Sequence, residues 1–107
     1  MRRDPNRVIW KFQFAVADDV SIEMPAFAEI LHVDVQNDVP AIWAIVDPRR
    51  EVETRKFHLY GTGHAMCVGD GTAEHSTPAQ SEAHIGSFML RNGQLVFHLF
   101  EVPSWLR

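Results

Sequence analysis

The chain has 107 residues, a formal net charge of −4 and 46% hydrophobic residues, which is enough for one globular domain with a modest core. The acidic balance argues against general nucleic-acid binding, because a protein that binds the phosphate backbone carries a basic face. Cys67 is the single cysteine, so the composition excludes an intramolecular disulfide and favours a reducing compartment.

The N-terminal segment 1–7 is polar and lacks the apolar run of a signal peptide. No apolar stretch approaches the roughly 20 residues that a membrane-spanning helix requires. We therefore expect an intracellular, soluble protein with no membrane partner.

Alternating apolar and polar side chains predict strands in the first half of the chain. Strands of this kind are expected over residues 8–15, 21–24 and 30–36, and the apolar run over 40–46 predicts a fourth strand. Trp10 and Trp43 are interpreted as core side chains, and Leu31, Val33 and Val35 are expected to face the core.

The turn signal Asn37-Asp38 predicts a hairpin between the strands over 30–36 and 40–46. The second of these strands is apolar on both faces. A strand of that kind is usually central in its sheet or covered by a second layer.

Three further strands are expected over 55–60, 85–90 and 95–102, and Asn92-Gly93 between the last two is the strongest hairpin signal in the chain. Residues 65–83 have no periodicity and are interpreted as a long loop. The result is a single domain over 1–107, with tails over 1–7 and 103–107. Its predicted fold is all-β, with about seven short antiparallel strands in a sandwich or partly closed barrel and little or no helix.

Six short motifs, in this order, resemble a family of small uncharacterised proteins found mainly in bacteriophages and prophages. They are Ile9-Trp10-Lys11, Ile22-Glu23-Met24-Pro25, Ala41-Ile42-Trp43-Ala44-Ile45-Val46-Asp47, Tyr60-Gly61-Thr62-Gly63-His64, Ile85-Gly86-Ser87-Phe88 and Leu95-Val96-Phe97-His98-Leu99-Phe100-Glu101. The resemblance spans residues 8 to 102 and implies a phage accessory protein that acts in the host cytoplasm. Two features depart from the family: the segment 65–83 is longer than the usual connection, and Phe27 stands where a small residue is expected.

The tight turn from Tyr60 to His64 is the clearest candidate for a ligand site. Glycine tolerates positive φ, and successive backbone N–H groups in such a turn can form a nest for an anion. Side chains around the turn add donors and positive charge, so phosphate or a nucleotide is the ligand class expected. The candidate ligand-binding residues are Arg55, Lys56, Tyr60, Gly61, Thr62, Gly63 and His64. The alternative is that the two glycines only allow the chain to turn.

The histidines and the cysteine give no strong catalytic or metal-binding pattern. His64 and Cys67 have a His-x-x-Cys spacing, but zinc usually takes its four ligands as tight pairs and only one such pair is present. His98 is interpreted as a partly buried histidine that bonds a neighbour. No hydrolase or zinc-protease motif occurs. We therefore assign no catalytic residue, metal or cofactor, and favour a protein that is not an enzyme.

The C-terminal tail carries Trp105 and Leu106 outside any predicted strand. An apolar tail either folds back on its own domain or docks on another subunit. The predicted sheets also have edges that no helix covers, and forming a homo-oligomer would protect them. Trp105 and Leu106 are therefore the candidate oligomer or partner contacts.

The first hypothesis for function is a non-enzymatic, phage-type accessory binding protein. It would bind a host protein or sequester an anionic small molecule such as a nucleotide, and so inhibit a host process or defence. The alternative is a structural or assembly protein of the virion. A third hypothesis is a small hydrolase or metal enzyme that uses His64 and Cys67.

Overall fold

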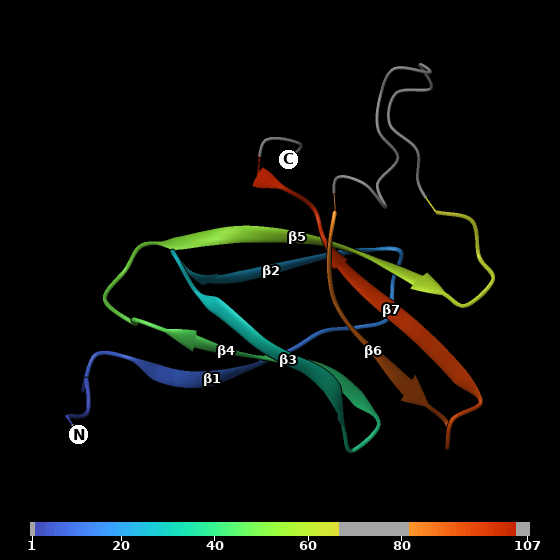
Figure 1. The fold of residues 1–107 in the computed structure, drawn as a ribbon, viewed down its shortest axis with the longest axis horizontal. Helices are drawn as coiled ribbons and strands as arrows, with labels where there is room; N and C mark the ends of the chain where they lie inside the picture. Colours follow the sequence, from blue (N-terminus) through green and yellow to red (C-terminus); the bar gives the residue numbers. More distant parts are fainter. Residues whose placement is uncertain (1, 67–81, 105–107) are drawn as a thin grey trace.

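Seven antiparallel strands form two sheets that pack face to face in the computed structural model, which describes residues 2–66 and 82–104 (Figure 1). The three-stranded sheet has the order β1-β4-β3, and the four-stranded sheet has the order β2-β5-β7-β6. The strands are β1 (Val8–Gln13), β2 (Asp19–Pro25), β3 (Glu29–Gln36), β4 (Val39–Val46), β5 (Val52–Gly61), β6 (Ala83–Leu90) and β7 (Leu95–Glu101). The predicted all-β sandwich is confirmed, and the sheets do not close into a barrel. No helix in the described ranges is long and apolar enough to cross a membrane.

Both predicted hairpins are present, and residues in the left-handed region close each of them. Asn37 and Asp38, with φ of 54° and 62°, link β3 to β4 between the paired residues Gln36 and Val39. Two consecutive residues with positive φ are the mark of the type I′ turn, whose twist matches that of the strands. The β6–β7 turn includes Asn92 and Gly93, also with positive φ.

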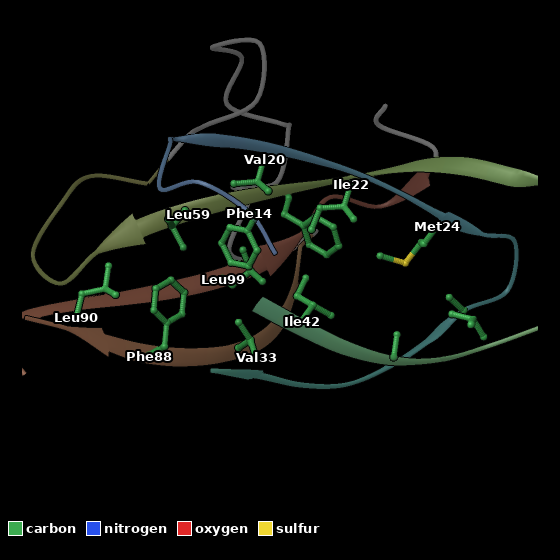
Figure 2. Packing of buried hydrophobic residues seen from close by; sticks show 14 residues of the cluster. Phe14, Val20, Ile22, Met24, Val33, Ile42, Leu59, Phe88, Leu90 and Leu99 are labelled. Atoms are coloured by element: carbon green, nitrogen blue, oxygen red, sulfur yellow. The ribbon is translucent and has the colours of Figure 1, made fainter. Parts of the chain in front are cut away.

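The core lies between the two sheets, as Figure 2 shows. Strand β4 is central in its sheet, as its two apolar faces predicted, and its inward side chains Ile42, Ala44 and Val46 are fully buried. The four-stranded sheet contributes alternate residues of each strand, and burial of these side chains is the main favourable term in folding. They are Val20, Ile22, Met24, Phe57, Leu59, Phe88, Leu90 and Leu99.

The two sheets approach most closely along β3 and β6. A Cβ atom at Gly86 would lie only 2.7 Å from Cγ1 of Val33, so the close approach requires a glycine at that position. The register of β6 against β7 also shifts between His84 and Gly86. This contact joins the inner faces of the two sheets at β3 and β6.

The prediction that Leu31 faces the core is wrong, because β3 contains a bulge. Ile30 pairs with Ala44 and His32 pairs with Trp43, so Leu31 has no partner in the ladder and is 46% exposed. An extra residue in a strand reverses the alternation that a regular strand would have. Ile30 takes the place of Leu31 against the core.

The interpretation of Trp10 as a core residue is also wrong. Trp10 pairs with the buried Ala44 and therefore points inward, but it is 42% exposed because β1 is an edge strand. Trp43 is half-buried on the outer side of β4, where its ring lies 6.3 Å from that of His32.

Candidate functional site

The turn after β5 is a four-residue turn in which each glycine has a different role. The His64 N–H donates to the Gly61 carbonyl at 3.0 Å, and Gly63 at the third position has φ of +85°. That pattern is the one of a type II turn. Gly61 does not have positive φ. A Cβ there would lie 2.7 Å from Nδ1 of His64, so Gly61 instead allows the imidazole to lie against the end of the strand.

Two backbone amides of this turn are already used within the fold. The Thr62 N–H donates to the Val96 carbonyl of β7 at 3.2 Å, and the His64 N–H closes the turn on Gly61. These bonds hold the turn against the neighbouring strand. A ligand at this place would therefore be contacted mainly by side chains.

Arg55 lies on the inner side of β5, away from the turn. Its Nε donates to Oε2 of Glu101 at 2.6 Å and its Nη2 to Oε1 at 2.8 Å, while Nη1 donates to the Ala28 carbonyl at 2.6 Å. These hydrogen bonds to Glu101 raise the pKa of Arg55 above its ordinary value. Paired in this way, the guanidinium joins β5, β7 and the segment before β3.

The other predicted residues divide between the two faces of the sheet. Lys56, Tyr60 and Thr62 alternate with the buried Phe57 and Leu59, and so lie on the outer face. The His64 ring lies on the opposite side, since it contacts the position where a Gly61 Cβ would point.

Two rows of side chains cross the outer face of the four-stranded sheet. In one row, Tyr60 of β5 and Ser87 of β6 both pair with His98 of β7. In the next row, His58 and His84 both pair with Phe100. We call this surface, with the adjoining Thr62, the histidine face and define it as His58, Tyr60, Thr62, His84, Ser87, His98 and Phe100.

The exposed half of the histidine face is one hydrogen-bonded chain. Nδ1 of His98 lies 2.7 Å from Oγ of Ser87, and its Nε2 lies 2.7 Å from Oγ1 of Thr62. Nε2 of His84 lies 3.4 Å from the same Ser87 oxygen. A neutral imidazole has one donor and one acceptor nitrogen, so one hydroxyl donates to His98 and the other accepts from it. The ring is thus fixed from both sides.

The other half of the histidine face, His58 and Tyr60, lies against Glu82, which immediately precedes β6. The Glu82 side chain is only 1% exposed, and the Tyr60 hydroxyl donates to its Oε2 at 3.2 Å. Oε1 of Glu82 lies against Nδ1 of His58, whose Nε2 is 3.2 Å from Oδ1 of Asp19. A buried carboxyl group is tolerated only where polar groups lie against it, so these contacts fix the start of β6 to β5.

Phe100 separates the two halves and adds an aromatic surface. Its ring centroid lies 5.0 Å from that of His84 and 5.7 Å from that of Tyr60. The tilted and edge-to-face angles are those that aromatic pairs prefer.

Several predicted residues lie outside the described ranges. They are Cys67, Trp105 and Leu106, together with most of the segment 65–83. The hypothesis of an enzyme that uses His64 and Cys67 therefore stays a prediction. The same holds for Trp105 and Leu106 as oligomer or partner contacts. Within residues 2–66 and 82–104, no three His, Cys, Asp or Glu side chains are grouped to hold a metal ion.

The local sequence patterns do not join His58, His84, Ser87 and Glu82 to the site. Alternation gives the face of each side chain, but only the register between strands shows which side chains lie next to each other. Glu82 follows the aperiodic segment, and no local pattern marks it as buried.

The fold and this surface define an all-β sandwich that carries hydrogen-bonding side chains on one sheet face. The chain belongs to the family described as domain of unknown function DUF7352, whose model matches residues 5–105. No curated protein and no solved structure matches the chain. Membership of an uncharacterised family is as predicted.

Proposed function

We propose that this chain is a non-enzymatic binding protein that holds a small anionic ligand, such as a nucleotide, on the exposed half of the histidine face. The observation that carries the proposal is the position of His98, 2.7 Å from both the Ser87 and the Thr62 hydroxyl on a solvent-facing sheet. Groups already held in place bind with less loss of conformational entropy.

The chemistry of this surface fits a phosphate attached to a flat ring. Hydroxyl and imidazole groups can donate to phosphate oxygens. Lys56 is exposed on the same face, two residues before His58, and supplies a cation in a chain whose net charge is −4. The rings of Phe100 and His84 offer a surface on which a base can stack.

The same geometry favours binding over acyl transfer. Ser87 and His98 are placed as a nucleophile and its base would be. In a catalytic triad, however, the second imidazole nitrogen bonds a carboxylate that orients the ring and stabilises the imidazolium. In this chain the second nitrogen of His98 bonds the Thr62 hydroxyl, which cannot stabilise that charge in the same way.

The proposal extends to biological context. The resemblance to phage and prophage proteins supports an accessory role in the host cytoplasm, where sequestration of a nucleotide signal, or capture of a host protein, would inhibit a host process or defence. We also propose that the chain works as a homo-oligomer.

Ligand-induced thermal stabilisation tests the binding site. Wild-type protein is screened with mononucleotides, cyclic dinucleotides and inorganic phosphate, and a ligand at about 100 times its Kd is expected to add roughly 2.7 kcal/mol of stability. His98→Ala should abolish the rise in melting temperature. His32→Ala is the matched control, since it removes an exposed imidazole from the other sheet. The proposal would be contradicted if both variants lost the ligand-induced rise in melting temperature equally, or if the wild type showed no such rise.

A second candidate, a virion structural or assembly protein, is supported by large apolar side chains that stand exposed on the surface. They are Ile9, Phe27, Val52 and Met89. Such side chains are typical of contacts between subunits. This function predicts stable higher oligomers without ligand-induced stabilisation, and mass measurement in solution together with proteomics of purified particles separates it from the first.

A further inference from the structure

Strand β1 is an edge strand with an unusual number of exposed apolar side chains. Among the strands that the structure describes it pairs only with β4, and it lies at the margin of the molecule in Figure 1. Ile9 is 61% exposed, and its neighbours Val8 and Trp10 are also exposed. An edge strand has backbone N–H and C=O groups free to pair, so an apolar edge is a template for a further strand.

The other sheet edges carry more protection than β1, whose single charged side chain is Lys11. Strand β2 has the charged side chains Asp19 and Glu23 on its exposed side and ends at Pro25. Strands β3 and β6 lie against each other where Val33 meets Gly86. Charges, proline and coverage are the usual ways in which proteins block edge pairing.

Charge restricts how β1 can pair antiparallel with a second copy of itself. Directly opposed residues in such a pair point to the same side of the sheet. The two-fold axis, perpendicular to the sheet, must therefore lie midway between the two copies of one residue. An axis at Ile9 would oppose Arg7 to Lys11, and an axis at Lys11 would oppose Lys11 to its own copy. Like charges directly opposite each other are destabilising.

An axis at Trp10 avoids both conflicts. It opposes Trp10 to Trp10, Val8 to Phe12 and Ile9 to the stem of Lys11, and each of these pairs buries apolar surface. Aromatic pairs contribute beyond the area that they bury.

We propose that β1 pairs with β1 of a second copy in the register centred on Trp10, which joins the two three-stranded sheets into one continuous sheet. This pairing rests on the homo-oligomer proposed above and names β1 as its contact surface. It does not depend on ligand binding.

Two substitutions of one residue test the register. Ile9→Lys places a lysine opposite Lys11 of the second copy, whereas Ile9→Glu places a carboxylate there. Both variants lose the same apolar side chain at an exposed position, so folding, checked by circular dichroism, should be unaffected. Because each dimer contains the pair twice, we expect the dimer dissociation constant of Ile9→Lys to exceed that of Ile9→Glu roughly tenfold, with a smaller ratio at high salt.

Sedimentation equilibrium of the full chain over a wide concentration range gives the dissociation constants. The β1 surface is supported if the wild type is dimeric and the dissociation constant of Ile9→Lys exceeds that of Ile9→Glu. A wild type that is dimeric while both variants dissociate alike overturns the β1 surface but leaves self-association in place. A wild type that is monomeric at every concentration overturns both.

Cross-linking offers a second readout in a Cys67→Ser background. Cα atoms of directly opposed residues in an antiparallel pair are about 4.5–5.5 Å apart, which suits a disulfide. Trp10→Cys should therefore form a covalent dimer on oxidation, and Ile9→Cys should not. Efficient cross-linking of Ile9→Cys in preference to Trp10→Cys would overturn the register.

Discussion

Nδ1 of His98 lies 2.7 Å from Oγ of Ser87, across the paired strands β7 and β6. The second nitrogen of the ring lies at the same distance from the Thr62 hydroxyl, so the imidazole is held on both sides. This surface, formed by β6, β7 and the turn after β5, is the centre of the proposed ligand site.

Removal of either hydroxyl should release the His98 ring. Thr62→Val keeps the side-chain shape. In this variant we expect the chemical shifts of the two His98 ring nitrogens to move toward the values of a mixture of tautomers. Nitrogen-detected correlation spectra of the histidine rings would measure this, with His32 as the internal control. Identical His98 shifts in the variant and the wild type would show that Thr62 does not fix the ring.

Loss of the Arg55–Glu101 pair should destabilise the fold. The two side chains are 13% and 15% exposed, and removing one partner leaves the other charge poorly compensated. We expect Glu101→Ala to lower the free energy of unfolding by about 2–3 kcal/mol in urea titrations. Arg49→Ala, which breaks the exposed pair with Asp47, is the control and should have a smaller effect.

Glu82 should matter for stability more than its place beside an aperiodic segment suggests. Glu82→Ala removes the partner of both the Tyr60 hydroxyl and His58. The expected loss is about 2–3 kcal/mol in the free energy of unfolding. Glu23→Ala on the exposed side of β2 is the matched control, and a comparable loss there would argue against a specific role for Glu82.

The two glycines of the turn should respond differently to alanine. Gly63→Ala places a side chain at φ of +85° and should cost about 1–2 kcal/mol whatever its surroundings. Gly61→Ala creates a contact with the His64 ring, so a second substitution, His64→Ala, should restore stability. Thermal unfolding of the single and double variants measures both effects. Rescue of Gly63→Ala by His64→Ala is not expected.

Asp47 should titrate at unusually low pH. Hydrogen bonds that the Arg49 side chain and the Arg49 backbone N–H donate to the Asp47 carboxylate lower the pKa of Asp47 from 3.8 to about 2. Because the pKa is lower in the folded state, the stabilisation is present above pH 3.8 and is lost as the pH falls toward 2. Carboxyl carbon shifts should show the Asp47 midpoint rising in Arg49→Ala. An unchanged midpoint would contradict this cause.

The strands and two of their hairpins follow from local sequence patterns. Alternation or an apolar run located each of the seven strands that the structure describes, and Asn37-Asp38 and Asn92-Gly93 marked turns that require positive φ. These signals are local, because side-chain period and turn chemistry depend on neighbouring residues. The two apolar faces of β4 also placed it correctly at the centre of its sheet.

Local deviations from regular geometry could not be predicted from alternation. The bulge at Leu31 and the edge position of β1 decided that Leu31 and Trp10 are exposed. Phe27, noted in the sequence as larger than expected, has φ of 64° and is 82% exposed. Its conformation depends on the turn in which it is held.

The set of side chains that forms the candidate site depends on how the strands pair in the folded chain. The sequence marked the turn from Tyr60 to His64, but strand pairing brought Thr62 and Ser87 to His98 and placed Arg55 against Glu101 on the other face. The physical reason is that a sheet places side chains together by register between strands distant in sequence. Alternation along a single strand carries no information about that register.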